Sequence, residues 1–158
     1  MTAQSLTNKS YKGFTLIELL VVIGILAVLL AIVLIAINPA RQFAQANDTK
    51  RRSDVNAILN AVDQFASDNA GILPNGITGA SLVIGSGAGK ADICAQLVTK
   101  YLAALPSDPT TGSPKGQVID CAAAYSTGYT IIKSATDNRV TVSATGEIDP
   151  STPISVTR

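Results

Sequence analysis

Residues 13–37 read GFTLIELLVVIGILAVLLAIVLIAI, an apolar run in which Glu18 is the single charge. A helix needs about 20 consecutive apolar residues to cross a bilayer, and the run from Phe14 to Ile37 exceeds that length. The preceding residues, MTAQSLTNKSYKG, are polar and include Lys9 and Lys12 but no acid. Because basic residues stay on the cytoplasmic side, the sequence predicts one span with the N-terminus inside and the rest of the chain outside.

Three kinds of segment have such a run. A secretory signal peptide has an apolar core of about 7–15 residues and a small-residue cleavage site, whereas this core is longer and no such site follows Ile37. A plain signal anchor fits the length. However, a carboxylate in a spanning helix costs roughly 2.5–3.5 kcal/mol at its centre and less near an end, so such residues usually have a function. A plain anchor explains neither Glu18 nor the abrupt change of composition at Gly13.

The third interpretation is a resemblance. GFTLIELLVVI, residues 13–23, resembles the class III signal of type IV pilins and type II secretion pseudopilins. The resemblance implies a leader at residues 1–13, cleavage between Gly13 and Phe14, N-methylation of Phe14, and a role for Glu18 in subunit assembly. It also implies the partners: a prepilin peptidase and methyltransferase, the inner-membrane assembly machinery, membrane lipid before assembly, and other copies of the chain in a helical fibre afterwards.

The charge pairing at this signal follows from elementary electrostatics. Cleavage would leave a positive amine on Phe14, beside an apolar helix bundle. A buried charge is tolerated when it is paired, and the Glu18 carboxylate of a neighbouring subunit would pair with it. The acid would then set the register between subunits, as one polar residue does in a coiled coil.

Composition argues against several other functions. Twelve basic residues against eleven acidic ones leave no basic excess for direct nucleic-acid binding. The chain has no histidine and no nucleophile with a recognisable base, so we expect neither an enzyme nor a cofactor. We expect no metal site either. Pseudopilins bind calcium in a carboxylate-lined loop, but here solvated loop acids without EF-hand-like spacing are favoured over such a site: Asp108, Asp120, Asp137, Glu147 and Asp149.

The middle of the chain, residues 38–70, is predicted to be an amphipathic continuation of the helix. Asn38-Pro39 predicts a bend or break, and Gly71 with Pro74 predicts the end. The apolar residues fall at helical spacing on one face: Val55, Ile58, Leu59, Val62, Phe65 and Ala66. Lys50-Arg51-Arg52 would suit anionic lipid, but a solvated turn flanked by acids is the favoured interpretation.

Residues 71–158 are predicted to form a globular head. We expect a short strand at Ser81–Ile84, a helix over Asp92–Leu105, a hairpin of Tyr129–Ser134 with Arg139–Ala144, and an edge strand at Ile154–Thr157. The fold class is therefore α+β: a long N-terminal helix, transmembrane in its first half and amphipathic in its second, packed on a small antiparallel β-sheet. This architecture resembles the ladle shape of the pilin family.

The two cysteines, Cys94 and Cys121, lack the CxxC grouping of zinc and redox sites. In a domain that faces an oxidising exterior they are expected to form one disulfide. Their interval also resembles a pilin disulfide loop.

The favoured function is a structural subunit of a type IV pilus-like fibre: first a single-pass membrane protein, then part of an extracellular or periplasmic fibre. One alternative is a pseudopilin of a type II secretion or competence system, since LPSDPTTGSP at 105–114 resembles the LP-x-DP-x-x-G-x-P segment of major pseudopilins and some pilins. Another is a solute-binding or adhesive module held by a simple signal anchor. That module would tolerate replacement of Glu18 by leucine.

Overall fold

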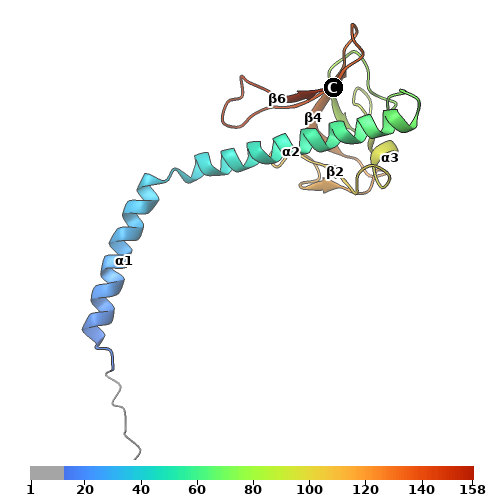
Figure 1. The fold of residues 1–158 in the computed structure, drawn as a ribbon. Helices are drawn as coiled ribbons and strands as arrows, with labels where there is room; N and C mark the ends of the chain where they lie inside the picture. The colour runs from blue at the N-terminus through green and yellow to red at the C-terminus, as the bar shows by residue number, and fades with distance from the viewer. Residues whose placement is uncertain (1–12) are drawn as a thin grey trace, which may run out of the picture. The chain divides into compact units, whose positions relative to one another are not determined.

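The structure is a computed structural model that describes residues 13–158. The leader predicted at residues 1–13, with Lys9 and Lys12, lies outside this range except for Gly13. The chain divides after Pro39 into two compact units. The first contains helix α1 (Leu16–Ala36), and the second contains nearly all of helix α2 (Pro39–Asp68) together with the β-strands (Figure 1).

Helix α1 is apolar all round, and each of its residues is exposed. Among the described residues, α1 is the one helix that is long and apolar enough to cross a membrane. It ends where Ile37 adopts an extended conformation, and α2 begins at Pro39. Proline suits the first position of a helix because its missing N–H would have no partner there. The break predicted at Asn38-Pro39 is confirmed.

Helix α2 packs on the head through the predicted apolar stripe. Val55, Ile58, Leu59 and Val62 are fully buried, whereas no residue of α2 before Asp48 is buried. The helix ends as expected, with Gly71 in a left-handed conformation and its N–H donating to the carbonyl of Ala66 at 2.8 Å. This contact satisfies a carbonyl of the last turn that would otherwise lack a partner.

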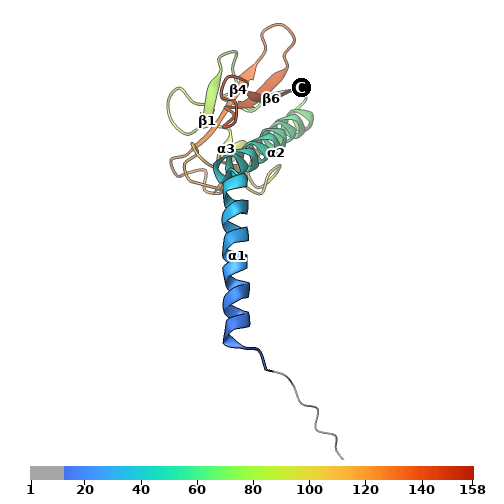
Figure 2. The same cartoon turned by 90° about the vertical axis from the view of Figure 1, so that its left-hand side faces the viewer.

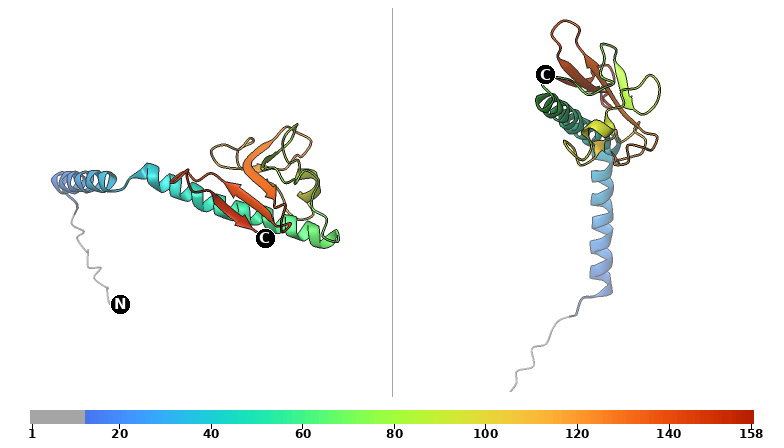
Figure 3. Two further views of the ribbon diagram at one scale, coloured as in Figure 1. Left: turned by 90° about the horizontal axis from the view of Figure 1, so that it is seen from above. Right: turned by 90° about the vertical axis from the view of Figure 1, so that its right-hand side faces the viewer.

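The head contains one four-stranded antiparallel sheet and one two-stranded sheet. The larger sheet has the order β1 (Leu82–Gly85), β4 (Ser126–Lys133), β5 (Val140–Ala144), β6 (Ile154–Thr157). The smaller pairs β2 (Leu105–Pro106) with β3 (Gln117–Val118). Helix α2 runs across the larger sheet (Figure 2; Figure 3, left). Its buried side chains and those of Ile131 in β4 and Val142 in β5 belong to one hydrophobic core. The predicted α+β class, hairpin and edge strand are confirmed.

The prediction of one helix over Asp92–Leu105 is wrong. The α-helix there, α3, covers only Cys94–Leu97. The chain turns back at Thr99, which has a left-handed φ of 73°, and its N–H donates to the carbonyl of Leu102 at 2.7 Å. Ile93, Leu97 and Leu105 are all buried, so the apolar spacing predicted burial correctly. It did not predict the conformation, because a turn can also direct such residues into the core.

Candidate processing and assembly site

The predicted cleavage junction precedes α1 and has no regular secondary structure. Gly13 and Phe14 lie before the helix, and Phe14 is 79% exposed. A Cβ atom added at Gly13 would meet nothing within 4 Å. Packing against residues 14–158 therefore does not require glycine at position 13.

The predicted assembly residue, Glu18, is bonded to the start of its own helix. Its Oε2 atom accepts from the backbone N–H of Thr15 at 3.0 Å and from the Thr15 hydroxyl at 2.8 Å. The Glu18 N–H donates to the Thr15 hydroxyl oxygen at 3.3 Å, which completes a capping box. Such a box satisfies donors that a helix start leaves without partners, and the acid also suits the positive end of the helix dipole.

Thr15 was missed in the sequence analysis, although its signal is present. The residues from Thr15 to Glu18 read T-L-I-E, the T-x-x-E pattern of a capping box before an apolar run. Glu18 therefore caps the helix of its own chain, and its role between subunits stays a prediction. It lies in the first turn of α1, near the end of the span, where a carboxylate costs less than at the centre.

Comparison with known proteins identifies this region. Residues 8–34 match the family model described as the prokaryotic N-terminal methylation motif. The chain carries the class III signal of type IV pilin-like proteins. The match covers the predicted leader junction and most of α1, but not the head. No curated protein and no solved structure matches the chain.

The head contains a buried charge cluster centred on Arg51. The guanidinium donates to Asp108 from Nε at 2.6 Å, to Asp48 from Nη1 at 2.8 Å, to Glu147 from Nη1 at 3.1 Å and to the Thr110 hydroxyl from Nη2 at 2.6 Å. The side chains of Arg51, Asp48 and Asp108 are each 5% exposed or less. The cluster thus joins α2 to the loop after β2 and to the loop after β5.

This cluster corrects two expectations. Arg51 was predicted to lie on a solvated turn of α2, and Asp108 to be a solvated loop acid, yet both are buried. Only the neighbours Lys50 and Arg52 are exposed. The prediction failed because it treated the charge as solvated. Arg51 lies four positions before Val55 and seven before Ile58, which puts it on the buried face of the same helix.

Hydrogen bonds decide the charge state of the buried acids. Burial disfavours the charged form of Asp108, but the bonds from Arg51 and from the N–H groups of Thr110 and Thr111 outweigh it and hold its pKa well below the ordinary value. Burial likewise opposes ionisation of Asp48. The N–H groups of Glu147 and Ile148, at 2.8 and 3.1 Å, and the Arg51 guanidinium lower its pKa nevertheless.

We expect the head to lose stability in acid for this reason. A carboxyl whose pKa is depressed by folding contributes stability above its unfolded pKa of about 3.9, and this contribution disappears as the pH falls further. The free energy of unfolding should fall by up to about 1.4 kcal/mol per pH unit for each proton taken up on unfolding. Urea unfolding of the detergent-solubilised chain between pH 7 and pH 2 measures this slope. Asp108→Asn should flatten the dependence of the free energy of unfolding on pH, whereas Asp120→Asn, on an exposed loop, should not. Equal pH dependence in the two variants would show that Asp108 is not a source of the acid sensitivity.

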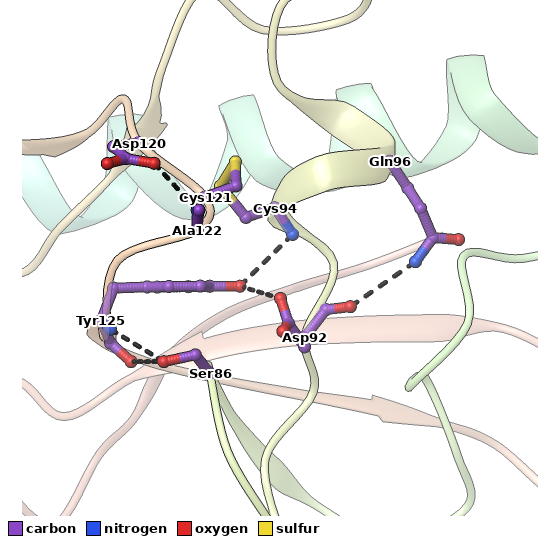
Figure 4. Close-up of a disulfide and its surroundings, with 8 residues drawn as sticks. All are labelled: Ser86, Asp92, Cys94, Gln96, Asp120, Cys121, Ala122 and Tyr125. Atoms are coloured by element: carbon purple, nitrogen blue, oxygen red, sulfur yellow. Dashed lines mark hydrogen bonds between the residues drawn. A yellow bond between two sulfur atoms is a disulfide. The ribbon is translucent and has the colours of Figure 1, made fainter.

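A disulfide joins α3 to the segment after β3. The Cα atoms of Cys94 and Cys121 are 5.5 Å apart, and the bond closes a loop of 27 positions (Figure 4). The buried Tyr125 lies beside it: its hydroxyl donates to Asp92 at 2.7 Å and accepts from the Cys94 N–H at 3.3 Å. Burial and the bond to Asp92 raise the pKa of Tyr125, so the phenol stays a neutral donor.

Reduction of this disulfide should destabilise the head by roughly 3–4 kcal/mol on the chain-entropy model for a loop of this length. Guanidinium unfolding of the oxidised chain, compared with the Cys94→Ala/Cys121→Ala double variant, measures the difference. Thiol labelling of the folded, unreduced protein is the accompanying control. Two reactive thiols in that sample would refute the bond.

Proposed function

We propose that this chain is the precursor of a structural subunit of a type IV pilus-like fibre. The leader at residues 1–13 is removed, Phe14 is N-methylated, and the mature subunits polymerise through residues 14–37. The observation that carries the proposal is the methylation motif over residues 8–34, which coincides with an apolar helix whose only acid lies in its first turn. Such a motif points to a structural, pilin-type protein, and such proteins are usually not enzymes.

Assembly is driven by the same residues. After cleavage the amine of Phe14 lies four positions before Glu18, and no cation occurs between Leu19 and Ile37. Within one subunit, Thr15 holds the Glu18 carboxylate at the helix start. In a staggered helix bundle the carboxylate also accepts the amine of the next subunit. Only this second pairing lowers the free energy of the fibre relative to the separate subunits.

The topology follows from the same segment. Lys9 and Lys12 lie directly before the span, so we place the leader in the cytoplasm and the head outside. The Cys94–Cys121 disulfide is consistent with an oxidising exterior. The subunit is thus a single-pass membrane protein before assembly and a part of an extracellular or periplasmic fibre afterwards. Its processing partner is a prepilin peptidase that also methylates, and the inner-membrane assembly machinery extracts it from the lipid.

A pseudopilin of a type II secretion or competence system is the second candidate. It shares the methylation motif, and the LPSDPTTGSP segment at 105–114 favours it. The structure gives that segment a concrete role, because its Asp108 is the acid bonded to Arg51 at 2.6 Å. We favour the pilin because of its disulfide loop, and fibre imaging separates the two: a pilin forms long surface fibres at natural expression levels.

The test combines imaging with intact-mass analysis of fibres sheared from cells that express the chain. We expect fibres that contain residues 14–158 with one added methyl group. Gly13→Leu is the matched control. Since no residue of 14–158 lies near a Cβ at position 13, this variant should insert and fold normally but remain uncleaved and outside fibres. A chain from wild-type cells that still begins at Met1, or that begins after residue 37, would refute the proposal.

A further inference from the structure

The loop between α2 and β1 contains the sequence Pro74-Asn75-Gly76-Ile77. The Ile77 N–H donates to the Pro74 carbonyl at 3.3 Å, so Asn75 and Gly76 are the central residues of a tight turn. Gly76 has a left-handed φ of 103°, which glycine adopts without strain at this position of a turn. Both central residues are exposed. The turn therefore presents an asparagine side chain to solvent directly before a glycine.

The backbone of Asn75 is held in place, whereas its side chain is free. The Asn75 N–H donates to Oε1 of Gln96 in α3 at 2.8 Å, and Nε2 of Gln96 donates to the Asn75 carbonyl at 3.2 Å. Within residues 13–158 neither the Asn75 side-chain amide nor the Gly76 N–H has a hydrogen-bond partner. Asparagine is a thermolabile residue because its side-chain amide can react with the next backbone nitrogen. Both reacting groups are unbonded at this turn.

The other described asparagines lack this combination. Four have hydrogen-bonded side chains: Asn47, Asn56, Asn60 and Asn69. Asn38 precedes Pro39, which has no N–H to react. Asn138 is exposed, but the N–H of the next residue, Arg139, donates to Asp137 at 3.2 Å. The bulk of the Arg139 side chain also restricts approach there, whereas glycine at the following position does not.

We propose that Asn75 is a site of spontaneous deamidation in the folded head. The Gly76 nitrogen loses its proton to the solvent and attacks Cγ of Asn75. The bond between this nitrogen and Cγ forms, the Cγ–Nδ2 bond breaks, and ammonia leaves, which closes a five-membered succinimide ring. Water then opens the ring at either carbonyl and gives aspartate or isoaspartate. The reaction consumes water and releases ammonia, and it needs neither an oxidant nor an enzyme.

Conversion would change both the charge and the backbone at this turn. The groove that Asn75 and Gly76 line also contains two cations, Lys133 and Arg158, and one acid, Asp63. A new carboxylate would offset the surplus positive charge of this groove. Isoaspartate also lengthens the main chain directly before Gly76, where a Cβ would already meet the Asp92 nitrogen at 3.2 Å. This inference goes beyond the proposed function and does not depend on it.

The test uses the full, folded chain in detergent, incubated in mildly alkaline and in mildly acidic buffer. Peptide mass spectrometry locates the mass gain that replacement of an amide by a carboxylate produces, and an isoaspartyl methyltransferase labels the isoaspartate. We expect several-fold more conversion at Asn75 than at Asn138. Conversion should be faster in alkaline buffer, because the attacking amide must lose its proton. Asn75→Gln is the matched control: it keeps the backbone bonds to Gln96, but its attack would have to close a six-membered ring, so this position should stay unconverted.

Three results would overturn the inference. The first is an absence of conversion at Asn75 in the folded chain, with the chain unfolded in urea as the positive control for detection. The second is equal conversion at Asn75 and Asn138, which would show that the hydrogen bonds do not select the site. The third is a mass gain without isoaspartate, because direct hydrolysis of the side chain bypasses the ring. Circular dichroism checks the fold of Asn75→Gln, and the comparison with Asn138 in the wild-type chain does not depend on that variant.

Discussion

Arg51→Met is expected to destabilise the head by about 3–5 kcal/mol, the usual cost of removing one partner of a buried ion pair. The substitution keeps most of the side-chain volume but leaves Asp48 and Asp108, both less than 5% exposed, without their common cation. It also breaks the link between α2 and the loops that carry Asp108 and Glu147. Urea unfolding of the detergent-solubilised chain at pH 7, followed by circular dichroism, measures the loss.

The neighbouring arginine is the control for this prediction. Arg52→Met removes the same charge one position later, where the side chain is exposed, and should change the free energy of unfolding by less than about 0.5 kcal/mol. Adding Asp108→Asn to Arg51→Met should recover part of the stability, because an amide is cheaper to bury than an unpaired carboxylate. Equal losses for Arg51→Met and Arg52→Met would show that the cluster does not stabilise the head.

Glu18→Leu is expected to reduce fibre yield by more than about tenfold while the membrane pool of the protein is maintained. An unpaired Phe14 amine inside a helix bundle costs several kcal/mol, and 1.4 kcal/mol already corresponds to a factor of ten. Insertion should be unchanged or improved, since a polar group is removed from lipid. The measurement is the ratio of fibre protein to membrane protein for wild type and variant at equal expression. Wild-type assembly of Glu18→Leu would show that pairing of Glu18 with the Phe14 amine does not drive assembly.

The capping box makes two further variants necessary for this experiment. Glu18→Gln keeps an acceptor for the Thr15 N–H but carries no charge, because the box accepts Glu or Gln at this position. Thr15→Ala keeps the charge but loses the cap, at a cost of about 1 kcal/mol. If the charge between subunits drives assembly, Glu18→Gln should fail like Glu18→Leu, and Thr15→Ala should assemble. The opposite pattern would assign Glu18 to capping alone.

Features encoded by near neighbours in the chain were predictable from the sequence. The span needs only a long apolar run, and the stripe from Val55 to Val62 needs only helical spacing, so both were predicted. The strands β4, β5 and β6 were predicted from β-branched runs separated by turn residues. The capping box between Thr15 and Glu18 belongs to the same class, since its pattern is complete within four residues.

Features that depend on distant parts of the chain were decided only by the tertiary structure. Arg51 bonds to Asp108, 57 positions away, and to Glu147, 96 positions away, and no local pattern identifies these partners. The predicted helix over Asp92–Leu105 failed for a related reason. Apolar spacing records which residues face the core, whereas the course of the chain there is decided by the turn at Thr99 and by packing against distant segments. Burial can be encoded locally, but pairing between distant segments becomes definite only when the chain has folded.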